Sequence, residues 1–203
     1  MIVQSVMPEL AIHSDLDPEL SFYSEQVRGI KRSTEELIRN TNPAQLLWKP
    51  KPDQWSISQC LDHLVATART ELPLIQRAIA DGRSRGLFGH GPFRYSRIAA
   101  LLVNLMGAPP RLRFKAPRLY LPAEAKEPAV VIREFFQSQD DILDCFRMAD
   151  GLHLARIKVP VYDYKYIRLS LGQGFKLFVI HEQRHILQAQ RIKTGGGVRG
   201  VRQ

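Results

Sequence analysis

Four segments of this chain repeat apolar residues at intervals of three and four, and this pattern constrains the fold more than any other feature. The segments cover residues 17–40, 56–82, 129–148 and 171–193. A spacing of three and four places the apolar side chains on one face of a helix. Long amphipathic helices bury such faces against one another. Because no segment reads as a convincing strand, the sequence predicts an all-α protein, a four-helix bundle.

Local signals support the predicted helix starts. Asp17-Pro18-Glu19 has the form of an N-cap followed by proline at the first helical position. Ser56 and Gln59 have the spacing of a capping box, in which each side chain bonds the other residue's backbone N–H. These signals place the beginnings of the first two helices.

The chain length is that of one domain with room for additions. With 203 residues, one well-buried core is expected. We expect a single domain with the bundle over about 17–193, a long insertion over about 83–128 and a flexible tail over 194–203. Within the insertion, residues 94–106 are a further helical candidate and residues 117–122 read as extended. Residues 158–168, which are rich in tyrosine, are expected to form a loop.

The composition favours a cytoplasmic protein without membrane spans. Hydrophobic residues make up 44% and charged residues 24% of the chain, as in an ordinary globular protein. No apolar run approaches the length of a membrane span, and the first residues do not resemble a signal peptide. Cys60 and Cys145 each lie in an apolar helical pattern, which favours reduced core thiols in the cytoplasm over a disulfide.

The net charge of +9 is concentrated in two regions. Residues 82–123 contain seven arginines and one lysine without any acid, and the chain after Glu182 is also basic. The insertion is open to three interpretations: an anionic substrate or thiol cofactor, a nucleic acid or anionic lipid, or a solvated, partner-facing surface. Nucleic acid is disfavoured because no known binding motif accompanies the charge. The apolar face of 94–106 suggests a homodimer.

His181 and His185 lie on the apolar stripe of the last predicted helix, with Phe178, Ala189 and Ile192. Residues four apart are separated by about 40° around the helix axis and about 6 Å along it, so both imidazoles face one point. Burying an imidazole costs free energy unless it is bonded. Either a metal ion binds this pair, or both are core histidines with other hydrogen-bond partners.

A bundle builds metal sites from side chains on facing helices, so a third ligand is expected on another helix. His63 borders the apolar stripe of the second helix. Three neutral imidazoles with open positions would make a reactive site rather than a closed structural one. Gln188 is a candidate to orient a ligand. A surface or core amide without a role at the site fits the sequence equally well.

For three nearby residues we favour a role in packing or hydrogen bonding over a role in the site. Cys60 is read as a small buried hydrophobe rather than a ligand or nucleophile. Gln139 is expected to bond a helix neighbour rather than to face the site. Trp55 is expected to pack on the start of the second helix rather than to line a pocket. His13, His90 and His153 receive no role, because they lie in polar or loop contexts.

The chain resembles the DinB-like (YfiT-like) superfamily of metal-binding four-helix bundles. The first matching motif is Trp48-Lys49-Pro50, Trp55-Ser56-Ile57 and Leu61-Asp62-His63-Leu64, and the second is the run from His181 to Gln188. The family commonly has Glu where this chain has Gln59, a difference we assign to capping. The resemblance implies that the metal ligands are the following three residues: His63, His181 and His185.

The resemblance also implies a function. Members include transferases and isomerases that use low-molecular-weight thiols, and others regarded as hydrolases. We therefore expect a divalent-metal-dependent enzyme with a small-molecule substrate, acting as a thiol-dependent transferase or a hydrolase. Zinc, nickel, iron and manganese all suit imidazole ligands. The alternative is a non-catalytic helical bundle that binds metal or a partner.

Overall fold

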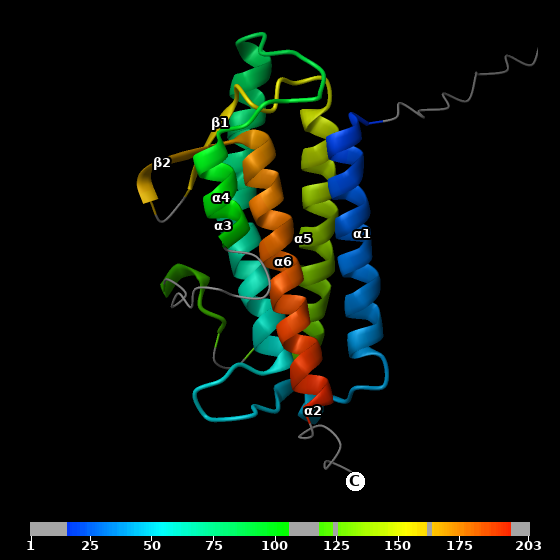
Figure 1. Ribbon diagram of the computed structural model, residues 1–203. Helices are drawn as coiled ribbons and strands as arrows, with labels where there is room; N and C mark the ends of the chain where they lie inside the picture. Colours follow the sequence, from blue (N-terminus) through cyan, green and yellow to red (C-terminus); the bar gives the residue numbers. More distant parts are fainter. Residues whose placement is uncertain (1–15, 106–117, 124–125, 162–163, 196–203) are drawn as a thin grey trace, which may run out of the picture.

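Four long helices lie side by side in the computed structural model (Figure 1), which describes residues 16–105, 118–123, 126–161 and 164–195. They are α1 (Pro18–Ile38), α3 (Ile57–Ser84), α5 (Pro128–Ala149) and α6 (Leu171–Thr194). Helix α3 packs on α5 and α6, and α1 packs on the same two helices. The predicted four-helix bundle is confirmed, with helix boundaries close to those expected. The predicted tail lies outside the described residues except for its first two.

The predicted caps form at the starts of α1 and α3. The Asp17 side chain accepts a hydrogen bond from the backbone N–H of Glu19, and Pro18 occupies the first helical turn. Ser56 and Gln59 make both bonds of a capping box. Glutamine serves here as well as glutamate, because its side-chain oxygen accepts from the Ser56 N–H at 3.2 Å.

The bundle encloses a large apolar core along its length. Its biggest fully buried side chains include Phe135, Phe146 and Phe175. A smaller cluster lies where α1 ends and α3 begins, and it includes Leu46 of the short helix α2 (Pro43–Leu47) and Ile57. None of the helices in the described part of the chain is both long and apolar enough to cross a bilayer.

A β-hairpin replaces the loop expected over 158–168. Strand β1 (Lys158–Val161) pairs antiparallel with β2 (Tyr164–Ser170), with a register irregularity between Pro160 and Val161. Val159 and Leu169 face each other and are buried. Because β1 packs on α3 and α6, the end of the bundle supplies the apolar surface that an isolated hairpin lacks. That surface is not visible in the local sequence.

The structure differs from two further expectations, one at the end of α3 and one in the expected insertion. Helix α3 does not end at Gly82 but continues to Ser84. A Cβ at Gly82 would collide with the side chain of Ile157, so this glycine permits close packing rather than ending the helix. Residues 118–120 form the short 3₁₀ helix η1 (Arg118–Tyr120) instead of an extended segment.

Helix α4 (Arg97–Leu105) and η1 lie between α3 and α5 in the chain. Helix α4 packs on α6, and η1 packs on α3. The helix predicted over 94–106 therefore forms, although it begins three residues later. The most basic part of the expected insertion, including Arg111, Arg113 and Lys115, lies outside the described residues.

Candidate metal centre

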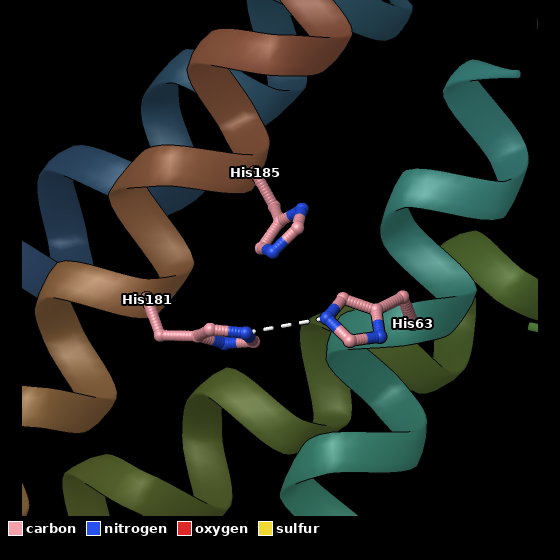
Figure 2. Close-up of side chains that lie close together, drawn as sticks. All are labelled: His63, His181 and His185. Atoms are coloured by element: carbon pink, nitrogen blue, oxygen red, sulfur yellow. Dashed lines mark hydrogen bonds between the residues drawn. The ribbon is translucent and has the colours of Figure 1, made fainter. Parts of the chain in front are cut away.

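Three histidines from two helices meet inside the bundle (Figure 2). His63 lies in the second turn of α3, and His181 and His185 lie one turn apart on α6. One ligand atom from each ring lies within 4.8 Å of the other two. The Nε2 atoms of His63 and His181 are 3.2 Å apart. His63 and His185 are buried and His181 is partly exposed.

The outer nitrogens of two rings have hydrogen-bond acceptors. Nδ1 of His63 donates to the backbone carbonyl of Tyr120 at 2.5 Å. Nδ1 of His185 donates to Oε1 of Gln188 at 3.1 Å. A ring nitrogen that faces a carbonyl oxygen must carry the proton, so in each neutral ring Nε2 keeps its lone pair. Both Nε2 atoms are therefore suited to bind a cation.

The spacing of the donors fits a divalent metal ion. A tetrahedral ion with bonds of about 2.0–2.1 Å separates two imidazole nitrogens by roughly 3.3 Å. The 3.2 Å between the Nε2 atoms of His63 and His181 is close to this nitrogen–nitrogen separation. Three imidazoles also leave at least one coordination position for water or substrate. The chemistry of the donor set therefore matches a catalytic metal site better than a structural one.

The surroundings favour the neutral form of all three rings. Burial lowers the pKa of His63 below its usual value, although the bond to Tyr120 opposes this shift. Burial and the neighbouring ring of His63 lower the pKa of His181 to about 3. Burial and both other rings lower the pKa of His185 to about 2. The Arg184 charge lowers all three values further. Neutral imidazole is the form that binds metal.

Trp55 packs on the start of α3, as expected, in the cluster that includes Ile57 and Cys60, and its ring also lies beside two of the histidines. Its ring centroid lies 4.7 Å from that of His63 and 5.8 Å from that of His185. Because the indole reaches across to α6, it also limits the orientations of the two histidine rings.

Glu182 is a residue that the sequence analysis missed. It lies next to His181 but points away from solvent, with 0% of its surface exposed. Nε2 of Gln139 on α5 donates to its Oε2 at 3.1 Å, while Oε1 of each of these two residues is buried without a partner. Burial raises the pKa of Glu182 to about 8, so its carboxyl is mainly neutral at pH 7. Our expectation that Gln139 bonds a helix neighbour is confirmed.

Cys60 is a buried core residue, as the sequence predicted. Cys60 is 0% exposed, and burial raises the pKa of its thiol to about 12. A buried, protonated thiol is a poor nucleophile. Cys145 is also buried, and its thiol is free. His90 and His153 do not belong to the histidine cluster, and His13 lies outside the described residues.

The fold and the site together define a four-helix bundle with a three-histidine cluster between two facing helices. A family model described as the DinB superfamily matches residues 26–189. Because this match covers most of the sequence, the chain belongs to the DinB superfamily, as its motifs indicated. A search of curated proteins gave no match.

One solved structure supports the fold. It is YfiT from Bacillus subtilis, described as a probable metal-dependent hydrolase with an unusual four-helix bundle topology. The two chains are 11% identical, and the match covers 97% of this chain and 93% of YfiT with a TM-score of 0.58. At this identity the likeness concerns the arrangement of the helices and not the reaction.

Proposed function

We propose that this protein is a divalent-metal-dependent enzyme whose metal ligands are His63, His181 and His185. The observation that carries the proposal is the convergence of three imidazoles, each with one ligand nitrogen within 4.8 Å of the other two. Their outer hydrogen bonds orient two of them, and we propose that Gln188 holds His185 in its ligating tautomer. Family membership adds support, as does the description of YfiT as a probable metal-dependent hydrolase.

A bound divalent ion would lower the pKa of a coordinated water or thiol, so that a nucleophile exists at neutral pH. The chain's own part would be to hold three nitrogens at one point, which would leave a further position on the ion for water or substrate. Of the three residues, only His181 is partly exposed. We propose a small-molecule substrate, and either hydrolysis or transfer of a low-molecular-weight thiol as the reaction. Zinc, nickel, iron and manganese are the candidate ions.

The alternative is a bundle that binds metal, or a partner, without catalysis. The burial of His63 and His185 gives this alternative some support, because a closed site binds an ion more readily than it admits a substrate. The two candidates agree on metal binding and differ in whether a water or thiol reaches the ion. A paramagnetic or spectroscopic probe of ligand exchange at the loaded site distinguishes them.

The first experiment measures metal content. Purified protein is loaded with each of the four ions, dialysed and analysed for stoichiometry. We expect about one ion per chain in the wild type and a loss of at least tenfold in affinity in His63→Ala and His181→Ala, because each removes a ligand. His90→Ala is the matched control, because His90 is exposed and outside the cluster. No bound ion in the wild type under any loading condition would reject the proposal.

The second experiment asks which reaction the site performs. The metal-loaded wild type is tested against electrophilic acceptors with several cellular thiols, and separately against simple esters and amides in their absence. Thiol-dependent turnover that disappears in His63→Ala would assign a transferase, and thiol-independent turnover a hydrolase. A fully loaded protein that is inactive in both panels, with no exchangeable ligand on the ion, would favour the non-catalytic alternative.

A further inference from the structure

The segment before α5 is attached to α3 at the level of the histidine cluster. We call residues 118–123 together with Lys126 the strap. It contacts α3 through the neighbouring residues Asp62 and His63 and, farther along the helix, through Glu71. Only the contact with His63 involves the proposed metal site directly. The other contacts determine where the strap lies.

Asp62 is the first anchor. It is 6% exposed, and both of its carboxylate oxygens bind the strap. Oδ2 accepts from the backbone N–H of Ala123 at 2.7 Å, and Oδ1 accepts from Nζ of Lys126 at 2.8 Å. Lys126 also pairs with Glu134 of α5. Charge-assisted bonds in a buried setting are among the stronger ones available to a protein, so this contact fixes the later part of the strap.

Tyr120 is the second anchor and is 9% exposed. Its hydroxyl donates to Oε1 of Glu71 at 2.6 Å, while its backbone carbonyl accepts from Nδ1 of His63 at 2.5 Å. One residue therefore binds α3 with both its side chain and its main chain. The phenol bond fixes the position of the same residue whose carbonyl faces the histidine.

We propose that Asp62 and Tyr120 are positioning residues, which hold the Tyr120 carbonyl against Nδ1 of His63 and thereby keep Nε2 free for a metal ion. The tautomer of a histidine is set by the hydrogen bond that its other nitrogen makes. If the carbonyl moves away, the proton can occupy Nε2 and compete with the ion. The consequence for metal affinity rests on the proposed function, whereas the consequence for the tautomer does not.

The test begins with the metal-free protein, with ¹⁵N-labelled histidine and nuclear magnetic resonance. In the wild type we expect His63 as the Nδ1–H tautomer. In Tyr120→Phe, in Asp62→Asn and in the variant with both changes, we expect a growing population of the Nε2–H form. His63→Ala assigns the resonance. Tyr23→Phe is the matched control, because the buried Tyr23 also donates to a glutamate, Glu19, at 2.9 Å, and it is not part of the cluster or the strap.

The second readout is metal affinity, measured by competition with a chelator. In the variant with both changes we expect a loss of roughly 10- to 100-fold, as is typical when residues that orient a metal ligand are removed. Each single variant keeps one anchor, so we expect a smaller loss of roughly 3- to 10-fold. Tyr23→Phe should bind as the wild type does. If the variant with both changes does not fold, the two single variants decide.

The outcomes separate the two proposals. A folded variant with both changes that keeps the Nδ1–H tautomer and wild-type affinity would overturn the positioning role and would leave the strap with a structural one. A wild type that binds no metal would reject the proposed function, while the tautomer measurement would still decide the positioning role. A tautomer change without any change in affinity would overturn the proposed effect on the metal.

Discussion

At the scale of single residues, two of the three imidazole rings are oriented by hydrogen bonds of their outer nitrogens. His63 and His185 each direct Nδ1 to an oxygen, and these oxygens belong to Tyr120 and Gln188. An imidazole without such a partner can rotate or change its tautomer, and its affinity for a cation falls. Under the proposed function, the oxygens that accept from the two Nδ1 atoms would therefore contribute to metal affinity by fixing the tautomer of each ring.

Glu182 gives a prediction about stability at this scale. Its neutral carboxyl and the Gln139 amide are both fully buried, and they form a hydrogen bond between α5 and α6. Glu182→Gln replaces the neutral carboxyl with a neutral group of the same shape, so we expect a change below about 1 kcal/mol at pH 7. Glu182→Ala leaves a cavity and an unpaired amide, so we expect a loss of about 2–4 kcal/mol. Urea unfolding measures both changes.

The comparison of these two variants is informative in both directions. A loss of several kcal/mol in Glu182→Gln would mean that a neutral amide cannot replace the carboxyl at this buried position. An Ala variant as stable as the wild type would mean that the pair contributes nothing to the packing of α5 on α6.

At the scale of elements, the start of α3 controls the position of His63. Ser56 caps the helix through the N–H of Gln59 at 3.2 Å, and His63 lies one turn after Gln59. Trp55, just before the cap, packs on the same histidine. The cap residue Ser56, the neighbouring Trp55 and the proposed ligand His63 therefore belong to one continuous stretch of chain.

Removal of the cap should destabilise the protein without altering the histidines themselves. We expect Ser56→Ala to lower the free energy of unfolding by about 1 kcal/mol, because one N–H of the first turn loses its partner. Ser58→Ala is the matched control: Ser58 is also buried and lies in the first turn of α3, and its side chain makes no hydrogen bond with any residue that the structure describes. Equal losses in the two variants would show that burial, and not capping, is the cause.

At the scale of the whole molecule, a metal ion bound by His63 on α3 and by His181 and His185 on α6 would connect the two helices. An ion that binds only the folded chain stabilises it by about 2.7 kcal/mol at a concentration one hundred times its Kd. For a chain of this size we expect a rise of roughly 5–10 °C in Tm. Thermal unfolding with the ion, and again with a chelator, measures the difference.

His63→Ala provides the control for this prediction. The variant should show little or no rise in Tm with the same ion, because the remaining pair on α6 does not bridge to α3. A rise equal to that of the wild type would place the binding ion elsewhere in the molecule.

The homodimer stays a prediction. Helix α4 exposes Ile98 at 76% and Leu101 at 60% of their surfaces, an apolar face of the kind that subunit interfaces cover. The division of the chain into one bundle domain with an insertion and a tail also stays a prediction, as does the cytoplasmic location.

The amount that the sequence could predict followed the range of the interactions involved. Helix periodicity, the Ser56 cap and the pairing of His181 with His185 depend on residues a few positions apart, and all three were read correctly. The hairpin of β1 and β2 was missed because its apolar partners are on α3 and α6. Glu182 was missed because a carboxyl beside a histidine looks like a surface residue until α5 covers it.

The sequence by itself therefore determined which helices form and which of their faces are apolar, since backbone periodicity and capping are local properties. It also placed two imidazoles on one helix face, because residues four apart share a side. Only the tertiary structure decided that His63 meets them, that Trp55 closes over them and that the Tyr120 carbonyl orients His63. His63 lies 57 positions from Tyr120 and 118 positions from His181 in the sequence. Only the packing of the bundle brings such distant residues together.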